Sequence, residues 1–399
     1  MSRVDVLSES VSSVVISRRR LIGRLAAAGF TAPVIASIVA NGAWAQDAAT
    51  PTAEELLESI GKDPRLIQHG STTFETPMEL IDGLYTPNDL FFIRSNGPVS
   101  IDINPDEWRL SVTGLVNEEL DLSLADLQGM TPRTVSSWVE CSGNSRGRFA
   151  QGENEPASGT QWGNGAIGNA EWTGVSLIDV LNMAGLQESG VDVVSQGADF
   201  AEMQRGLPLE MAYDLDVMLA WEMNGEPVPA PHGGPVRLFV PGWGGIASTK
   251  WVVGLEIIDR PFQGTFNVES YVVIDANGAV LRPVQQMPVK SAINSPIPGA
   301  SVSAGDHTIA GYAWSGYGGI EQVEVSTDGG ETWQEATITL EAGPRSWVRF
   351  EYAWDAPAGE TVLMSRATDE RGLTQPDSVP WNRLGYQMNA VYQVPVSVA

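Results

Sequence analysis

The chain has 399 residues, with 23 lysines and arginines against 49 aspartates and glutamates, and a formal net charge of −26. Such an acidic chain lacks the basic surface that binding to nucleic-acid phosphates requires, which excludes nucleic acid as a partner. The charge would steer a basic protein such as a small cytochrome towards this chain, although solubility or adaptation to salt is the simpler explanation. The length is ample for two domains.

The first 45 residues have the layout of a twin-arginine export signal. Ser17-Arg18-Arg19-Arg20 precedes an apolar, alanine-rich stretch, and Ala43-Trp44-Ala45 offers small residues for cleavage. The alternative is an uncleaved membrane anchor, but charged and helix-breaking residues interrupt the stretch. We therefore expect an exported, periplasmic protein without stable membrane insertion. Because this route carries folded proteins, it also favours a chain that holds a cofactor.

Between residues 46 and 285 the pattern predicts short strands mixed with short helices. After a polar leader with a helix over 53–60, strands are expected at 109–112, 134–139 and 236–240, and helices at 124–128 and 177–184. Because no strand–helix alternation persists, the pattern argues against a doubly wound parallel sheet and for a mixed α+β domain.

From residue 286 the pattern changes to regularly spaced strands. The stretch 288–298 is interpreted as a linker, and Asp328-Gly329-Gly330 predicts a hairpin turn. Strands are expected at 307–314, 320–326, 332–340, 347–354, 361–368 and 390–398. This patterning is typical of an immunoglobulin-like β-sandwich, although the chain has no Cys…Trp…Cys staple.

Cys141 is the only cysteine in the chain and follows the predicted strand 134–139. With no internal disulfide possible, it is either a small buried hydrophobe or a reactive group. Ser142-Gly143-Asn144 predicts a tight loop, so the sulfur would face whatever pocket the loop surrounds. Arg146 and Arg148 lie close in sequence and would favour the thiolate, which is the form that binds metal.

Two further segments carry candidate binding residues. A stretch rich in glycine and proline places His232, Arg237 and Lys250 around one predicted strand, and these side chains suit an anionic phosphate or pterin-like ligand. Earlier in the chain, Phe91-Phe92 precedes Arg94. For each patch taken alone, a capped turn or an ordinary salt bridge is the simpler interpretation.

Taken together, these segments resemble the sulfite oxidase family of molybdenum-cofactor enzymes, over nearly all of the chain after residue 45. Cys141-Ser142-Gly143-Asn144 matches the family's Cys-x-Gly-Asn motif, and the segment from His232 to Arg237 matches His-Gly-x-Pro-x-Arg. The resemblance implies that Cys141 is the protein's sulfur ligand to molybdenum. The residues that it implies as contacts of molybdopterin are Phe92, Ile93, Arg94, Ser95, Asn96, Asp199, His232, Arg237, Ser248, Thr249 and Lys250.

The resemblance also implies a catalytic set and a function. Tyr271 corresponds to the family's active-site tyrosine and Trp162 to its pocket tryptophan, while Arg94 and Arg146 would bind the substrate anion. The leading expectation is a periplasmic molybdenum-dependent sulfite dehydrogenase that oxidises sulfite to sulfate by oxo transfer and passes electrons to a c-type cytochrome. The expected domains are a signal peptide at 1–45, a molybdopterin-binding domain at 46–285, and an immunoglobulin-like dimerisation domain at 286–399 that makes a homodimer.

One departure from the family pattern leaves the substrate open. Family members that oxidise sulfite carry an arginine in Trp-Asn-x-Arg-Gly, whereas here Arg383 stands one place early, which in a strand-like segment turns it to the other face. The nearest rival is the sulfane dehydrogenase subunit of the thiosulfate-oxidising system. Its substrate is a persulfide on a carrier protein, so its pocket mouth must be wide and less cationic.

The sequence disfavours two more hypotheses. The methionine-sulfoxide-reducing branch of the family lacks the C-terminal sandwich that is predicted here. A non-catalytic exported binding module that has lost the cofactor is disfavoured by the intact Cys141, His232, Arg237 and Lys250.

Overall fold

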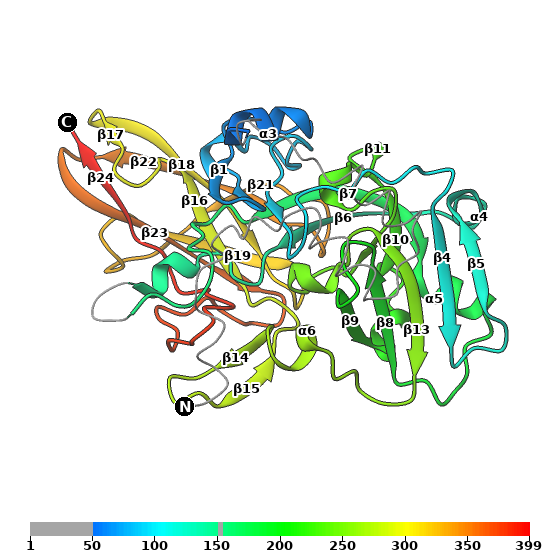
Figure 1. The fold of residues 1–399 in the computed structure, drawn as a ribbon. Coiled ribbons are helices and arrows are strands. Elements are labelled where there is room, and N and C mark those ends of the chain that lie inside the picture. Colours follow the sequence, from blue (N-terminus) through cyan, green and yellow to red (C-terminus); the bar gives the residue numbers. More distant parts are fainter. Residues whose placement is uncertain (1–50, 151–154) are drawn as a thin grey trace, which may run out of the picture. The chain divides into compact units, whose positions relative to one another are not determined.

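The computed structural model describes residues 51–150 and 155–399, so the export signal predicted over 1–45 lies outside the described residues. Strands dominate the described part of the chain, and its α-helices are short (Figure 1). These helices are α3 (Ala53–Ser59), α4 (Leu124–Gln128), α5 (Leu177–Met183) and α6 (Thr265–Val268). The fold is mostly β, with less helix than the predicted α+β class implies.

Two five-stranded sheets carry most of the chain before residue 260. One has the order β5 (Leu120–Ser123), β4 (Arg109–Gly114), β13 (Val252–Ile258), β8 (Asp192–Gly197) and β9 (Gln204–Pro208). The other has β11 (Glu226–Pro227), β10 (Met218–Met223), β7 (Ile167–Ser176) and β6 (Arg133–Glu140), with β12 (Arg237–Phe239) pairing with β10. Of these pairings, only β13 with β4 is parallel, which agrees with the prediction that the sheet is not doubly wound.

Local sequence explains the two predicted helices between these strands. α4 begins at Ser123, whose hydroxyl accepts the Asp126 N–H at 3.2 Å while the Asp126 carboxylate accepts the Ser123 N–H at 2.8 Å. This capping box satisfies backbone groups that the helix cannot pair. α5 buries Leu177, Val180 and Leu181 against the sheet that contains β4, at the spacing of one helix face.

Two smaller sheets complete the first part of the chain. They are formed by β1 (Ile67–Gly70), β2 (Thr73–Glu75) and β3 (Ile93–Arg94), and by β14 (Val272–Ile274) with β15 (Val280–Pro283).

The C-terminal part consists of two sheets that share one apolar core. The first contains β16 (Lys290–Ser295), β18 (Gly305–Trp314), β22 (Val348–Ala356) and β21 (Thr337–Leu340). The second contains β17 (Ser301–Val302), β24 (Val394–Val398), β23 (Gly359–Asp369), β19 (Ile320–Ser326) and β20 (Gln334–Glu335). The turn predicted at 328–330 joins β19 to β20.

Two predictions for this part were wrong in detail. The stretch interpreted as a linker contains β16, which pairs with β18 and has five of its six residues buried. Its sequence does not indicate a strand because the buried Lys290, Ser291 and Asn294 are polar and make hydrogen bonds with distant residues. The single strand predicted over 332–340 is divided between β20 and β21, which belong to different sheets.

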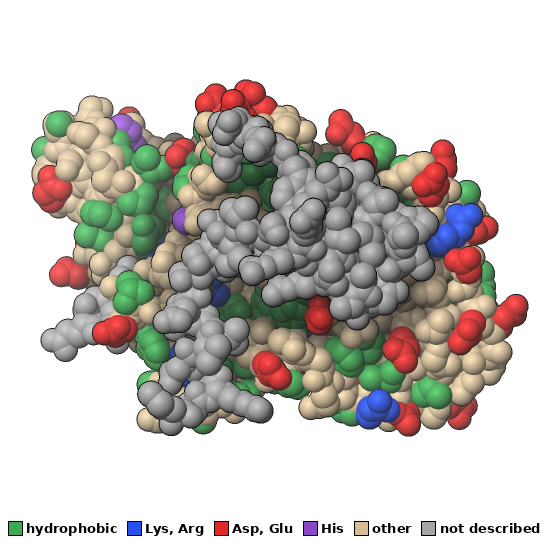
Figure 2. Space-filling view, viewed as in Figure 1, with side chains coloured by type: hydrophobic (Ala, Val, Ile, Leu, Met, Phe, Trp, Pro, Cys, Tyr) green, Lys and Arg blue, Asp and Glu red, His purple; other side chains and the backbone are tan. Residues whose placement is uncertain are grey.

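The two parts of the chain meet in a continuous core. Trp138 of β6 and Ile167 of β7 belong to the same apolar cluster as Trp314 and Trp347 of the C-terminal part, and residues 53–399 form one compact unit. Among the described residues, no helix has both the length and the apolar character to cross a membrane. The visible face in Figure 2 carries many acidic side chains and few basic ones, as the composition predicts.

Candidate active site

Cys141 follows β6 directly and begins a tight turn. Its N–H donates to the carbonyl of Ala166 at 2.8 Å, and its own carbonyl accepts the Asn144 N–H at 2.8 Å. Cys141 is buried and lines a pocket together with side chains from distant segments of the chain. The predicted strand and turn therefore deliver the only thiol to a pocket.

Gly143 is required because Arg146 passes directly over it. A Cβ at position 143 would lie 2.3 Å from Arg146 Nη2. Arg146 itself donates Nε to the Leu384 carbonyl at 2.8 Å and Nη1 to the Thr160 carbonyl at 2.9 Å. Its guanidinium is therefore held by backbone oxygens, and Arg146 does not line the pocket.

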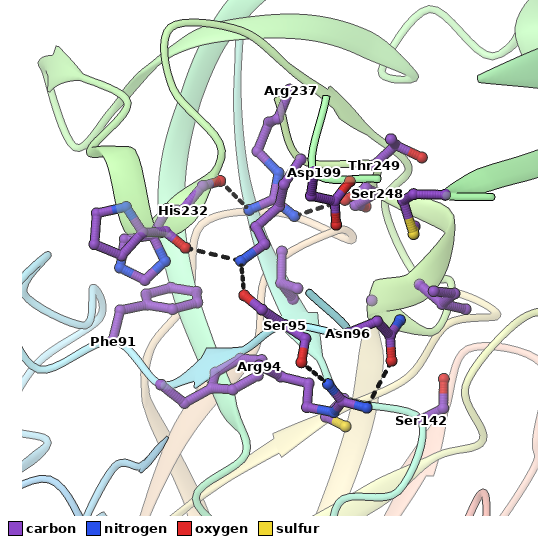
Figure 3. A pocket seen from close by; sticks show the side chains of 18 of the residues that line it. Phe91, Arg94, Ser95, Asn96, Ser142, Asp199, His232, Arg237, Ser248 and Thr249 are labelled. Carbon is purple, nitrogen blue, oxygen red and sulfur yellow. Dashed lines mark hydrogen bonds between the residues drawn. The ribbon is translucent and has the colours of Figure 1, made fainter. Parts of the chain in front are cut away.

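His232 and Arg237 lie at one end of the pocket (Figure 3), and Lys250, which also lines the pocket, bonds to the residue before His232. We call this the cationic end. Arg237 of β12 donates Nη1 to the His232 carbonyl at 3.0 Å and Nη2 to the Ser248 carbonyl at 2.9 Å. Lys250 donates Nζ to the Pro231 carbonyl at 3.0 Å. Within residues 51–150 and 155–399, none of the three forms an ion pair with a carboxylate.

Gly233 lets the turn that carries His232 pack closely against the backbone of Lys250. A short 3₁₀ turn ends at His232, and Gly233 follows with φ of 102°, a conformation that favours glycine. A Cβ there would also lie 2.7 Å from the Lys250 Cα. The glycine of the His-Gly motif thus meets both a conformational and a steric requirement.

Burial makes the charges at the cationic end costly. It lowers the pKa of His232 and that of Lys250 well below their ordinary values, and it lowers the pKa of Arg237 to about 10. Repulsion among neighbouring cations lowers the pKa of His232 and Lys250 further. A bound anion would oppose both effects, and His232 is neutral near pH 7.

Polar atoms without protein partners show what kind of ligand the pocket fits. Arg237 Nε, Asp199 Oδ1 and Ser142 Oγ are buried and make no hydrogen bond within the described residues, and all three residues line the pocket. Burial also raises the pKa of Asp199. Such atoms call for a ligand that both accepts and donates hydrogen bonds. Molybdopterin fits, because its phosphate accepts from cations and its pterin ring carries N–H donors.

The opposite end of the pocket carries Arg94 and Asn96 (Figure 3), and Tyr271, which also lines the pocket, lies against Asn96. Arg94 donates Nη2 to Asn96 Oδ1 at 2.7 Å, and Asn96 donates Nδ2 to the Tyr271 hydroxyl at 3.2 Å. The Tyr271 ring stacks on Tyr386, with 5.3 Å between centroids and 15° between the rings. Burial raises the pKa of Tyr386, and the nearby Tyr271 adds to the effect. The Tyr271 hydroxyl is thus held beside an arginine.

Most residues predicted for the site line this one pocket. They are Phe92, Arg94, Ser95, Asn96, Cys141, Asp199, His232, Arg237, Ser248, Thr249, Lys250 and Tyr271. Three predicted residues do not line it. Arg146 is bonded to backbone oxygens, Ile93 packs in a separate core with Leu57, and Trp162 packs edge-on against Phe92 behind the pocket wall.

Arg383 also stays outside the pocket. Its side chain is exposed and it does not line the site, which answers a question that the shifted position in the Trp-Asn-x-Arg-Gly pattern leaves open.

Sequence reasoning did not select several residues that line the pocket. They are Phe91, Val139, Ser142, Met203, Pro231, Gly245 and Ile246. Phe91 and Ser142 adjoin predicted residues and could have been included on that ground. Met203 had no signal, because β8 and β9 bring it to the pocket through a turn without a motif.

Comparison with known proteins agrees with this site. A family profile described as "Oxidoreductase molybdopterin binding domain" matches residues 96–266, and one described as "Mo-co oxidoreductase dimerisation domain" matches residues 282–399. The chain is 35% identical to mitochondrial sulfite oxidase from Homo sapiens, over 89% of this chain and 70% of that protein. The chain belongs to the sulfite oxidase family of molybdopterin oxidoreductases. Sulfite oxidase from Gallus gallus is 36% identical, over 84% of this chain and 79% of that protein.

A solved structure extends the family likeness to the fold. The crystal structure of the sulfane dehydrogenase SoxCD from Paracoccus pantotrophus matches with a TM-score of 0.76 and 32% identity, over 92% of this chain and 96% of that chain. This chain is therefore a molybdopterin oxidoreductase with a cofactor-binding domain and a dimerisation domain of the sulfite oxidase family.

Different residues of the pocket would hold different parts of the cofactor. The cationic end would hold the phosphate, Asp199 would accept from the pterin, and Cys141 would ligate the metal. No group of three or more His, Cys, Asp or Glu in the described residues could hold a metal ion, so the remaining soft donors must come from the pterin dithiolene. When bound, the cofactor would supply two-electron redox chemistry, and Arg94 and Tyr271 would bind the substrate beside it, with the Tyr271 hydroxyl holding a proton.

Proposed function

We propose that this enzyme oxidises sulfane sulfur presented on a carrier protein, as a molybdenum-dependent sulfane dehydrogenase. We call the end of the pocket opposite the cationic end the substrate end. The supporting observation is that, among the described residues, Arg94 is the only cation that lines the substrate end. Arg146 donates to two backbone carbonyls and does not line the pocket, and Arg383 is exposed outside it. Desolvating a free dianion such as sulfite requires several compensating cations, whereas a carrier-bound persulfide brings less charge into the pocket.

Sulfite is the second candidate, and two observations favour it. Arg94 and Tyr271 lie together at the substrate end, where one could bind an oxyanion and the other could donate a hydrogen bond to it. The relatives that are 35% and 36% identical are named sulfite oxidases.

A steady-state comparison with cytochrome c as electron acceptor separates the two candidates. We expect kcat/KM for a persulfidated carrier protein to exceed kcat/KM for sulfite. Arg94→Gln should lower kcat/KM for the preferred substrate by roughly 10- to 100-fold, the equivalent of one hydrogen bond to a charged group. Arg383→Gln is the matched control, because Arg383 is exposed. A higher kcat/KM for sulfite would contradict the sulfane proposal and support the second candidate.

We also propose the cellular setting and the assembly. The signal-like segment at 1–45 supports export to the periplasm, and the net charge of −26 supports a basic c-type cytochrome as electron acceptor. The dimerisation-domain match supports a homodimer. The two-sheet arrangement after residue 286 supports an immunoglobulin-like sandwich, with domain boundaries at 46–285 and 286–399. Size-exclusion chromatography with light scattering and fractionation of the native host test these proposals, and a monomer or a cytoplasmic protein would contradict them.

A further inference from the structure

Lys62 lies buried beneath the cationic end of the pocket, although neither family profile reaches it. It follows α3, and its N–H donates to the Leu57 carbonyl at 2.8 Å. Leu57 in turn packs against Phe74 and Ile93 in a small core. The end of α3 therefore fixes the point from which the Lys62 side chain extends towards His232, 170 positions away in the chain.

The Lys62 ammonium has three neighbours that can accept hydrogen bonds. Nζ donates to the Asn88 carbonyl at 2.5 Å and to the Phe91 carbonyl at 2.6 Å, and it lies 3.0 Å from His232 Nε2. An ammonium group has three donors and no acceptor. The three neighbours therefore account for all of its N–H groups, provided that His232 Nε2 carries no proton.

This arrangement determines which ring nitrogen of His232 carries the proton. Because burial and neighbouring cations lower the pKa of His232 well below its ordinary value, the ring is neutral and carries one proton. If Nε2 accepts from Lys62, that proton must sit on Nδ1. Nδ1 makes no hydrogen bond within the described residues, and His232 lines the pocket.

We propose that Lys62 is a positioning residue that fixes the His232 tautomer, so that Nδ1–H is available as a donor to an anion in the cofactor pocket. The inference rests on the proposed role of His232 in holding the phosphate of molybdopterin. In the other tautomer, Nε2–H would donate to the Asn88 carbonyl, 3.3 Å away, and Nδ1 would present a lone pair to the anion. Without Lys62, the Asn88 carbonyl would favour that other tautomer.

Nitrogen-15 NMR of the holoenzyme tests the tautomer directly, because the chain contains only three histidines. The full-length holoenzyme is labelled with ¹⁵N-histidine and measured by magic-angle spinning at pH 6, where the pKa of Lys62 of about 7 keeps the amine mostly protonated. His69→Gln and His307→Gln variants assign the remaining signal to His232. We expect wild-type His232 to show a protonated Nδ1 and an unprotonated Nε2, and Lys62→Met to reverse this pattern.

Cofactor retention supplies a second readout that does not depend on turnover. Lys62→Met should raise the dissociation constant of molybdopterin roughly 10- to 100-fold, the equivalent of one charge-assisted hydrogen bond. In a His232→Ala background the same substitution should change it by no more than about twofold, because the effect acts through His232. Arg65→Gln is the control, since Arg65 is exposed and pairs only with Asp63 in the same segment.

Three results would overturn the proposal. The first is a wild-type His232 that is protonated at Nε2 or at both nitrogens. The second is an unchanged tautomer in Lys62→Met, and the third is an equal loss of cofactor with and without His232. If Lys62→Met fails to fold, the wild-type spectrum alone decides. None of these measurements involves sulfite or persulfide, so an error in the proposed substrate would leave them unaffected.

Discussion

Buried cations have different partners at the cofactor pocket and at the junction between the two parts of the chain. At the junction, Lys290 lies 3.1 Å from Glu140 Oε1, and Glu140 also accepts from Asn144 at 2.9 Å and from Trp314 at 3.0 Å. At the pocket, Arg237 and Lys250 meet only carbonyl and hydroxyl oxygens. The protein pairs the buried cation at the junction with a carboxylate, whereas at the pocket Asp199 forms no ion pair with any described residue and only partly offsets the lowered pKa of Lys250. Buried cations that form no ion pair therefore indicate an anion site even where no ligand is present.

The largest expected effect is on turnover, from a substitution at Cys141 in the cofactor pocket. Cys141→Ser should abolish turnover, because a hydroxyl is a poor replacement for a thiolate ligand to molybdenum. The free energy of unfolding should change by no more than about 1 kcal/mol, since the side chain stays almost isosteric. X-ray absorption at the molybdenum edge should show one sulfur neighbour fewer. Wild-type activity in this variant would contradict the ligand assignment.

The next effect concerns stability at the junction. Lys290→Met should lower the free energy of unfolding by about 3–5 kcal/mol, because it leaves the Glu140 carboxylate buried without its cation. Urea unfolding measures this loss. The double variant Lys290→Met/Glu140→Gln should recover part of it, because the uncompensated charge is then removed. A loss below about 1 kcal/mol in the single variant would contradict the view that Lys290 compensates the buried charge of Glu140.

A smaller effect should appear in the pH dependence of the cofactor-free protein. Burial lowers the pKa of Lys62 to about 7, against about 10.4 in an unfolded chain. Between these values the unfolded state binds more protons than the folded state, so stability should rise with pH from about 7 to about 10. Lys62→Met should remove the part of this rise that Lys62 contributes. Equal slopes in urea titrations of both proteins would contradict the shifted pKa.

The smallest effect is expected at Arg383, which tests where the pocket ends. Because this side chain is exposed and outside the pocket, Arg383→Gln should change kcat/KM by less than about twofold for either sulfur substrate. Steady-state kinetics measure the change. A loss of tenfold or more would mean that Arg383 reaches the substrate during turnover.

The predictable part of the site consists of residues that local sequence delivers to a strand end. Cys141 follows a strand and precedes a glycine turn, and His232 and Gly233 form a turn before β12. In both cases the motif itself contains the conformational information. The residues contributed by these motifs therefore reach the pocket as predicted.

The part that could not be predicted depends on contacts between distant segments. Arg146 lies outside the pocket because its Nε donates a hydrogen bond to the carbonyl of Leu384, 238 positions later. Lys62 acquires its place from a helix end and a turn near Phe91. β16 buries polar residues such as Lys290 and Ser291, whose hydrogen-bond partners are 150 and 84 positions away. No local pattern encodes these outcomes.

The ion pair at the junction has a practical consequence for anyone who wishes to dissect this enzyme. Glu140 precedes Cys141 by one position, and both its lysine and its tryptophan partner come from the C-terminal part. A chain shortened before residue 286 would therefore leave the Glu140 carboxylate without its cation, directly beside Cys141. Point substitutions on the outer strands, rather than truncation, are the way to ask what the C-terminal part contributes to activity.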